Sequence, residues 1–233
     1  MTTNDITRKC GAEVFGTFCL VFAGAGAIVV NQVSGGAITH AGIALTFGLV
    51  ILAMIYAVGD ISGAHFNPAV TLGFWAAGRF PRREILPYVL SQCGGAILAS
   101  VVLRFLFPYN PTLGATMPRG TEPQSFVFEF FLTAILMFVI LCVSTGAKEK
   151  GITAGIVVGA VIGLEAMFAG PICGASMNPA RSFGPALVSG HLEHFWLYVV
   201  APILGALCAV PLCCYLQPAG CCGGPTTAKP LET

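Results

Sequence analysis

The chain has 233 residues with 11 basic and 10 acidic side chains, and 56% of its residues are hydrophobic while only 9% are charged. Soluble domains carry about a quarter charged residues, so this composition, with a mean hydropathy of +0.85, excludes a water-soluble globular protein. We predict an all-α integral membrane protein and expect the lipid bilayer, and no nucleic acid, as its surroundings.

Six apolar runs are long enough to cross a hydrocarbon core of about 30 Å, which takes roughly 20 helical residues. We place these spans at about 11–31, 41–59, 84–106, 124–145, 151–169 and 193–216. The first run is not read as a cleavable signal, because it lacks a small-residue cleavage site and contains Glu13.

Lysine and arginine residues collect on one side of the predicted membrane, as they do on cytoplasmic faces. They are Arg8, Lys9, Arg79, Arg82, Arg83, Lys148, Lys150 and Lys229. Arg104 and Arg119 face the other side, and Arg181 is left inside the membrane. We therefore expect a multi-pass protein of the cell (plasma or inner) membrane with both termini in the cytoplasm.

Ten cysteines do not indicate a disulfide framework in this chain. Four of them lie in apolar runs, where cysteine behaves as a small hydrophobic residue. Four others cluster after the last span, namely Cys213, Cys214, Cys221 and Cys222. We favour unpaired thiols in a reducing compartment for this cluster, with lipidation or soft-metal binding as the alternative. No cofactor and no metal site is predicted.

The two halves of the chain resemble each other. The run from Tyr88 aligns without gaps on the run from Tyr198, and Glu13 precedes Thr17 as Glu129 precedes Thr133. We place the repeats at about 1–107 and 124–216, with a Pro-rich linker between them and a tail at 217–233. Three spans per half make the second half enter from the opposite side, so an inverted repeat is expected with its site near the midplane. The whole chain, 1–233, is predicted to be one membrane channel domain.

The tripeptide Asn-Pro-Ala occurs once in each half, at Asn67-Pro68-Ala69 and Asn178-Pro179-Ala180. Asn is a favoured N-cap and Pro a favoured first helical residue. The segments 67–77 and 178–188 are each about 11 residues long, or roughly 16 Å, which is half a membrane. We predict two half-helices whose positive N-terminal ends meet in the membrane and oppose cations. Two simple helix caps are the alternative.

These paired boxes, together with Ala12-Glu13-Val14-Phe15-Gly16-Thr17, His65-Phe66 and Arg181, resemble the major intrinsic protein family of aquaporins and glycerol facilitators. The resemblance covers residues from about 8 to 216. It implies six spanning helices, two half-helices, a pore through each subunit and a homotetramer.

Several polar residues at membrane depth carry specific expectations, because such residues are expensive there and usually functional. Glu13 and Glu129 are expected to brace the loops before the half-helices, with a proton relay as the alternative. For Glu165 we favour the same bracing role over a pore-facing one. His65 is expected to approach the pore from the cytoplasmic side. Arg181 is expected at the narrowest part of the pore, with a structural carboxylate partner as the alternative.

The family resemblance, with spacing from the boxes, assigns the outer selectivity filter to four residues: Phe47, Ala166, Ala175 and Arg181. Water-selective members usually carry His at the position of Ala166, and glycerol facilitators usually carry Asp where Ser182 stands. The chain matches neither pattern. The stretch 170–178 and the run 196–199 are more similar to nodulin-like intrinsic proteins and their bacterial relatives, several of which pass glycerol and undissociated metalloid acids.

The predicted function is a passive channel for water and small uncharged solutes, such as glycerol and neutral metalloid acids, that excludes ions and protons. A water-selective aquaporin is the first alternative. An ion-coupled secondary transporter is less favoured, because no carboxylate accompanies either Asn-Pro-Ala box. A non-conducting junction protein of the same fold is a further alternative. An enzyme is not expected, since no nucleophile and base or metal-ligand spacing stands in a membrane-exposed loop.

Overall fold

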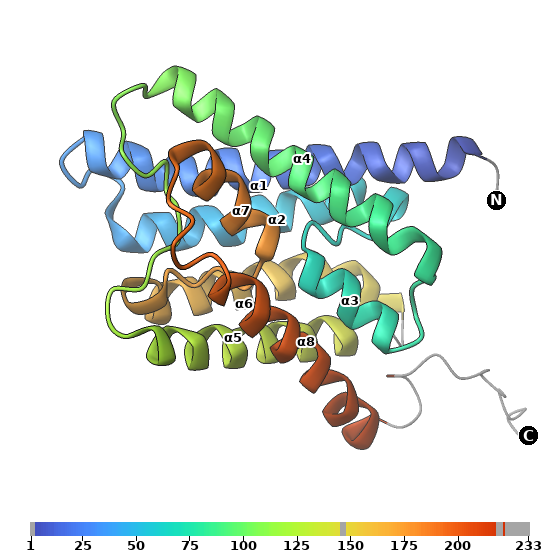
Figure 1. Cartoon of the computed structure of the whole chain (residues 1–233). Helices are drawn as coiled ribbons and strands as arrows, with labels where there is room; N and C mark the ends of the chain where they lie inside the picture. Colours follow the sequence, from blue (N-terminus) through green and yellow to red (C-terminus); the bar gives the residue numbers. More distant parts are fainter. Residues whose placement is uncertain (1–2, 145–147, 218–220, 222–233) are drawn as a thin grey trace, which may run out of the picture.

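Apolar helices make up most of the chain (Figure 1). The computed structural model describes residues 3–144, 148–217 and 221, and all regular structure within them is helical. The helices in chain order are α1 (Thr3–Val33), α2 (Thr39–Ser62), α3 (Pro68–Ala76), α4 (Arg82–Leu106), α5 (Glu122–Val143), α6 (Lys148–Cys173), α7 (Pro179–Ser189) and α8 (Leu197–Leu216). Six of the described helices are long and apolar enough to cross a membrane, which confirms the predicted spans.

The two remaining helices, α3 and α7, are the half-helices predicted after the Asn-Pro-Ala boxes. They have 9 and 11 residues, and each begins at the proline of its box. The Asn67 side chain accepts a hydrogen bond from the Ala69 N–H (2.9 Å), and Asn178 accepts from the Ala180 N–H (3.0 Å). Both helices therefore start where the Asn-Pro pair predicts.

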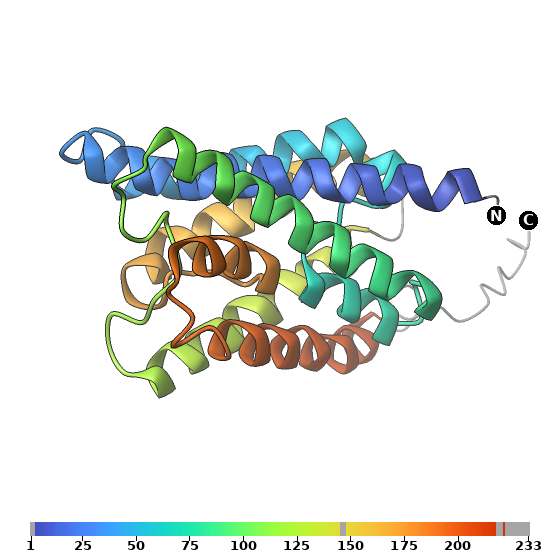
Figure 2. The ribbon, with the colours of Figure 1, turned by 45° about the horizontal axis from the view of Figure 1, so that its top comes forward.

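The long helices pack in corresponding pairs. Helix α1 packs against α4 and α2, α5 packs against α8 and α6, and α2 packs against α6. Figures 1 and 2 show that α1 begins and α8 finishes at the same end of the molecule, with α3 toward that end and α7 toward the other. Each half of the chain thus supplies three long helices and one half-helix.

Glycines let these helices touch backbone to backbone. A Cβ atom on Gly95 in α4 would lie 2.3 Å from the Val14 carbonyl oxygen of α1. A Cβ on Gly205 in α8 would lie 2.2 Å from the Phe130 carbonyl oxygen of α5. Such close approach is how helices associate in membranes, where lipid offers no hydrophobic driving force between them.

Gly95→Ala is expected to destabilise the protein by about 1–3 kcal/mol, because the added methyl group forces α1 and α4 apart. The melting temperature of the purified protein in detergent measures the effect. Gly94→Ala is the matched control, since a Cβ on Gly94 meets nothing within 4 Å. Equal melting temperatures for the two variants would contradict the prediction.

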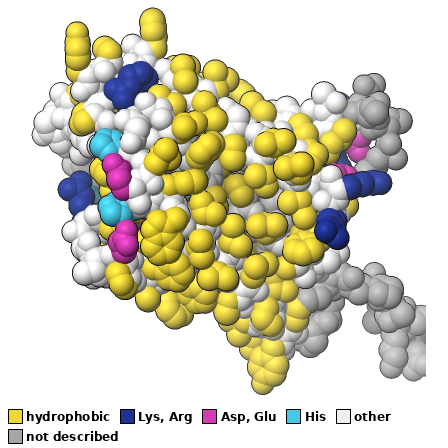
Figure 3. All heavy atoms as spheres, viewed as in Figure 1, with side chains coloured by type: hydrophobic (Ala, Val, Ile, Leu, Met, Phe, Trp, Pro, Cys, Tyr) yellow, Lys and Arg dark blue, Asp and Glu magenta, His cyan; other side chains and the backbone are white. Residues whose placement is uncertain are grey.

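The outer surface suits a bilayer. Figure 3 shows a broad area of hydrophobic side chains between charged side chains that gather at the two ends of the molecule. Exposed apolar side chains on several helices contribute to it, including Leu86, Phe105, Phe131 and Leu164. An exposed apolar surface of this extent marks contact with lipid or with other protein.

The expectation of unpaired thiols after the last span is wrong for the described cysteines of that cluster. Cys213 and Cys221 form a disulfide with their Cα atoms 5.7 Å apart, and Cys214 is also disulfide-bonded. The Cys221 N–H donates to the Gln217 carbonyl oxygen (3.1 Å). Cys221 therefore lies beside the last residues of α8. Cys222 lies outside the described residues.

Candidate pore and selectivity filter

The Glu13 carboxylate fills its hydrogen-bonding capacity with the loop that leads into α3. Its Oε1 atom accepts from the Ser62 hydroxyl (2.7 Å) and the His65 N–H (2.9 Å). Its Oε2 atom accepts from the Phe66 N–H (2.7 Å) and the Gln92 side-chain amide (2.8 Å). Because Glu13 is fully buried, these four donors stand in for the water that a carboxylate otherwise needs.

Glu129 makes the corresponding contacts in the second half. Its two oxygens accept from the Ser176 N–H (2.8 Å) and the Met177 N–H (2.7 Å), just before the second box. Phe66 and Met177 each precede the Asn of their box and have φ of 50° and 54°. Bulky residues rarely adopt positive φ, so the carboxylates stabilise a backbone shape that the side chains themselves disfavour.

The two boxes hold each other in place. The Asn67 side-chain amide donates to the Met177 carbonyl oxygen (2.8 Å), and the Asn178 amide donates to the Phe66 carbonyl oxygen (2.8 Å). An Asn amide has two N–H donors, so each Asn keeps a second one. Both residues line an internal cavity, and the second donors are available to a solute in it.

Two cavities meet at the predicted filter. The inner cavity, of about 50 Å³, runs from His65 past both Asn residues to Arg181. A buried water needs roughly 10–15 Å³ of such space, so this volume holds a short file of waters. The outer cavity is about 560 Å³. Phe47, Ala166 and Arg181 line both cavities, and Ala175 lines the inner one.

The inner cavity has a polar and an apolar wall. Its polar groups include Asn67, Asn178, Ser176 and the Arg181 guanidinium. Much of the rest is aliphatic and comes from α1, α2, α5 and α6, with Leu20, Ile51, Ile55, Leu136, Ile140, Val158 and Ile162. A solute with hydroxyl groups along one side and carbon along the other fits both walls.

Arg181 is buried to 3% exposure, and its guanidinium lies over the Phe47 ring, 5.1 Å from the centroid. Its Nη1 atom donates to the Gly114 carbonyl oxygen (3.1 Å). No carboxylate lies within ion-pair distance of it among the residues that the structure describes. A purely structural ion pair, the alternative for Arg181, is therefore not seen.

His65 lines the inner end of the cavity. Its ring stacks on Phe74 with the centroids 4.7 Å apart and also contacts Phe80 and Tyr88. Its Nδ1 atom lies 3.1 Å from the Thr71 hydroxyl. The ring is fixed on several sides, so the width of the pore there does not depend on a mobile imidazole.

The bracing role favoured for Glu165 is wrong. This side chain is 1% exposed, and neither of its carboxylate oxygens has a hydrogen-bond partner within the described part of the chain. Glu129 already accepts the loop N–H groups of Ser176 and Met177, which leaves Glu165 without a donor from that loop. It is also absent from the linings of the two pore cavities.

Sequence reasoning missed two groups of residues at this site. Gln92 links Glu13 to the Thr71 hydroxyl (3.0 Å), and a single Gln inside an otherwise apolar span was a usable signal. Gly114 and Thr116, from the linker between the halves, contact the second half-helix, and nothing in the linker sequence indicates this.

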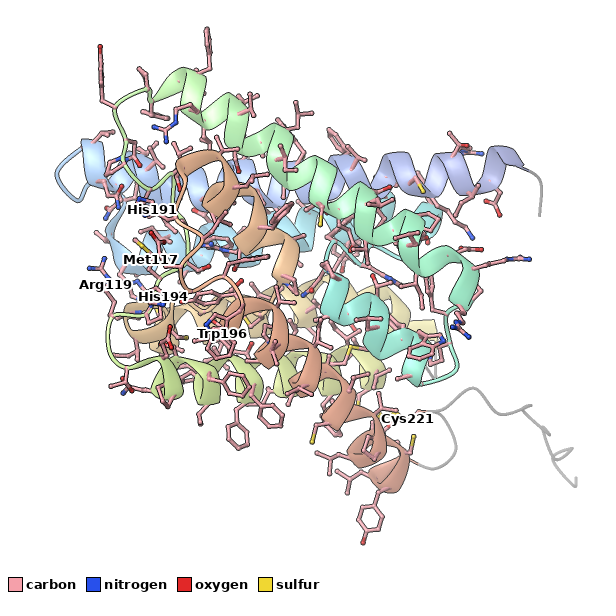
Figure 4. The ribbon with its side chains drawn as sticks, viewed as in Figure 1. Met117, Arg119, His191, His194, Trp196 and Cys221 are labelled. Atoms are coloured by element: carbon pink, nitrogen blue, oxygen red, sulfur yellow. A yellow bond between two sulfur atoms is a disulfide. The ribbon has the colours of Figure 1, made fainter. Side chains whose placement is uncertain are left out.

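The outer end of the molecule carries the polar rim of the outer cavity. Figure 4 shows Met117, Arg119, His191, His194 and Trp196 gathered at the end opposite to Cys221. The His194 Nδ1 atom lies 2.6 Å from a Glu122 carboxylate oxygen. Across the described residues, no three His, Cys, Asp or Glu side chains lie close enough together to hold a metal ion.

Comparisons of the sequence and of the structure with known proteins all find members of one family. Residues 1–212 match the family model described as Major intrinsic protein. Over 201 residues the chain is 52% identical to Aquaporin NIP1-1 of Zea mays, covering 86% of this chain and 71% of that protein. It is 48% identical to Nodulin-26 of Glycine max over 201 residues, or 86% and 74% of the two chains. The structure of the aquaglyceroporin from Plasmodium falciparum has a TM-score of 0.82 at 26% identity, covering 91% of this chain and 98% of that one.

Proposed function

The chain belongs to the major intrinsic protein family, a family of passive channels and not of enzymes, and we propose that it conducts water and small uncharged solutes across a membrane. The observation that carries this proposal is the pair of cavities that meet at Arg181, with both Asn residues along the inner one. The relatives named as aquaporins and as an aquaglyceroporin support it.

Transport follows from the hydrogen-bonding geometry of the boxes. A water in the inner cavity accepts a hydrogen bond from the free N–H of Asn67 or Asn178 and gives up one from its neighbour in the file. The N-terminal ends of α3 and α7 each carry about half a positive charge, and Arg181 adds a full one. Together they place a positive potential along the path, which opposes cations and protons.

We propose that the filter is Phe47, Ala166, Ala175 and Arg181, and that it passes glycerol and neutral metalloid acids besides water. Ala166 and Ala175 leave the constriction wide, and Arg181 supplies donors to hydroxyl groups while the Phe47 ring offers a face to carbon. The similar structure named as an aquaglyceroporin supports a filter that passes glycerol.

Stopped-flow light scattering on proteoliposomes tests the proposal with water, glycerol and a neutral metalloid acid as solutes. Flux of all three above empty liposomes is expected. Water flux alone would favour a water-selective aquaporin, and no flux would favour a non-conducting protein of the same fold. Saturable uptake that follows a proton gradient would favour a coupled transporter, although no carboxylate lines the inner cavity within the described residues.

Ala166→His is expected to lower glycerol flux about tenfold, the scale on which a pocket discriminates by size, while water flux falls much less. The imidazole narrows the constriction and replaces an apolar contact with a polar group. Light scattering on the same vesicle preparation measures both fluxes. Ala166→Ser is the control, because it adds a polar atom with little volume. Equal loss of water and glycerol flux in Ala166→His would contradict this view of the filter.

We further propose that Glu13 and Glu129 brace the loops before the half-helices, that His65 lines the cytoplasmic end of the pore, and that both termini are cytoplasmic in the cell (plasma or inner) membrane. The chain is then one channel domain of two inverted repeats, about 1–107 and 124–216, that assembles as a homotetramer. The corresponding helix pairings support the repeat, and exposed apolar side chains offer surface for assembly.

A further inference from the structure

Arg181 depends on the loop between α4 and α5 for its position. Of its guanidinium atoms, Nη1 donates to the Gly114 carbonyl oxygen (3.1 Å), while Nε is buried without a hydrogen-bond partner in the described residues. Gly114 belongs to residues 107–121, called the outer loop here. A shift of this loop therefore moves the one hydrogen-bond acceptor that the Arg181 guanidinium has among the described residues.

One side of Gly114 is anchored to the first half of the molecule. Asn110 donates from its side-chain amide to Gln32 of α1 (2.9 Å), and its side-chain oxygen accepts from the Leu113 N–H (2.8 Å). Gly114 itself has φ of 72°, and a Cβ there would lie within 3.0 Å of Ala25. The outer loop is therefore pressed against α1 at this point, and only glycine fits.

The other side of Gly114 is tied to the half-helix that carries Arg181. The Thr116 hydroxyl donates to the Ser182 hydroxyl (2.7 Å), and the Ser182 and Ser176 hydroxyl oxygens lie 2.5 Å apart. The Ser176 hydroxyl also donates to the Asn178 carbonyl oxygen (2.9 Å). All three side chains are at most 6% exposed, so water does not replace these bonds.

We propose that Thr116, Ser182 and Ser176 form a latch that positions Arg181 and thereby sets the size limit of the filter. Two hydrogen bonds join the same two segments, from Arg181 to Gly114 and from Thr116 to Ser182. Residues 181 and 182 are neighbours, and 114 and 116 are two apart, so the bonds act as a two-point clasp. Ser176 connects the clasp to the second Asn-Pro-Ala box.

The inference rests on the proposed channel function and makes Thr116 and Ser182 positioning residues. Without the latch, the outer loop keeps its Asn110 anchor, and the Arg181–Gly114 bond is the one remaining bond of the clasp to α7. The guanidinium then swings over a larger range, and the constriction no longer has a fixed width. The permeability to solutes larger than glycerol is expected to rise most, whereas the permeability to water, which already passes, is expected to change little.

The test is the ratio of erythritol to water permeability in proteoliposomes holding the full chain. Thr116→Val and Ser182→Ala are each expected to raise this ratio about fivefold. This is the change in an equilibrium constant that the loss of one typical hydrogen bond produces. The double variant is expected to match the single ones, because either change opens the same clasp. Thr116→Ser keeps the hydroxyl and is expected to restore the wild-type ratio.

Ser100→Ala is the matched control, since it removes a buried hydroxyl that donates only within its own helix, to the Ala96 carbonyl oxygen. Hydrogen–deuterium exchange of residues 112–119 is a second readout, which does not depend on flux. Faster exchange there in Thr116→Val, but not in Ser100→Ala, supports the latch.

An unchanged permeability ratio in folded Thr116→Val, with unchanged exchange in the outer loop, would overturn the latch and leave the channel function standing. A wild-type protein that passes neither water nor glycerol would overturn the channel function instead. The exchange experiment would still decide the latch in that case. If Ser182→Ala does not fold, Thr116→Val decides alone, because its change lies at the loop end of the clasp.

Discussion

Glu13→Ala is expected to abolish water and solute flux and to lower sharply the yield of folded protein. The substitution leaves the Ser62 hydroxyl, the Gln92 amide and the N–H groups of His65 and Phe66 without their acceptor. A buried donor without a partner costs about 1–3 kcal/mol. Four such donors together exceed the effect of most single substitutions, which lies at about 0.5–3 kcal/mol.

The structural consequence reaches the pore through Phe66. Its positive φ is disfavoured for a bulky side chain, and its carbonyl oxygen accepts the hydrogen bond from Asn178. Once the carboxylate is gone, the loop before α3 relaxes and the bond between the two boxes is lost. The melting temperature in detergent and the water flux in proteoliposomes measure the two effects.

Glu84→Gln is the control for Glu13→Ala. Glu84 is also a buried glutamate, at 5% exposure, but its side chain contacts the Lys9 ammonium group at 3.4 Å. Glu84→Gln removes the negative charge that faces Lys9 and leaves the loops before the half-helices unchanged. Glu13→Ala protein that melts and conducts like Glu84→Gln would show that the carboxylate does not hold the pore together.

The fold was predictable because membrane crossing leaves a strong local signal. Span length follows from bilayer thickness, and Asn-Pro marks a helix start whatever surrounds it. It was also predictable that Glu13 and Glu129 accept hydrogen bonds inside the membrane. A carboxylate in an apolar run needs hydrogen-bond donors, and each half of the chain contains one such carboxylate. The sequence does not show which groups donate to these carboxylates. One of the donors to Glu13 is Gln92, which comes from a helix far along the chain.

Three features depended on contacts that no local pattern reports. Glu165 was expected to brace a loop, but another carboxylate had already taken the donors of that loop. The clasp between Thr116 and Ser182 joins a polar linker to a half-helix across 66 residues. The disulfide joins Cys213 of α8 to Cys221 beyond the helix, and composition does not specify this pairing. In each case the feature depends on a contact between two segments that no local sequence pattern relates to each other.

Arg181→Val is expected to open the channel to protons and small cations while water flux is kept or increased. Arg181 is the only Lys, Arg, Asp or Glu among the described residues that line the inner cavity. Without it, the path keeps only the positive ends of α3 and α7, each worth about half a charge. A full charge buried near the path repels a cation by several kcal/mol at an effective dielectric constant of about 20.

The measurement for Arg181→Val is proton influx into proteoliposomes that hold a pH-sensitive dye, driven by a potassium diffusion potential. The rate is expected to rise clearly above that of wild-type vesicles with equal water flux. Arg181→Lys is the control, because it keeps the charge while its ammonium group is a poor substitute for the planar guanidinium. It is expected to exclude protons even where its glycerol flux changes. A proton rate in Arg181→Val equal to that of the wild type would assign charge exclusion to the half-helix ends and Asn residues alone, and Arg181 would then serve only to select among neutral solutes.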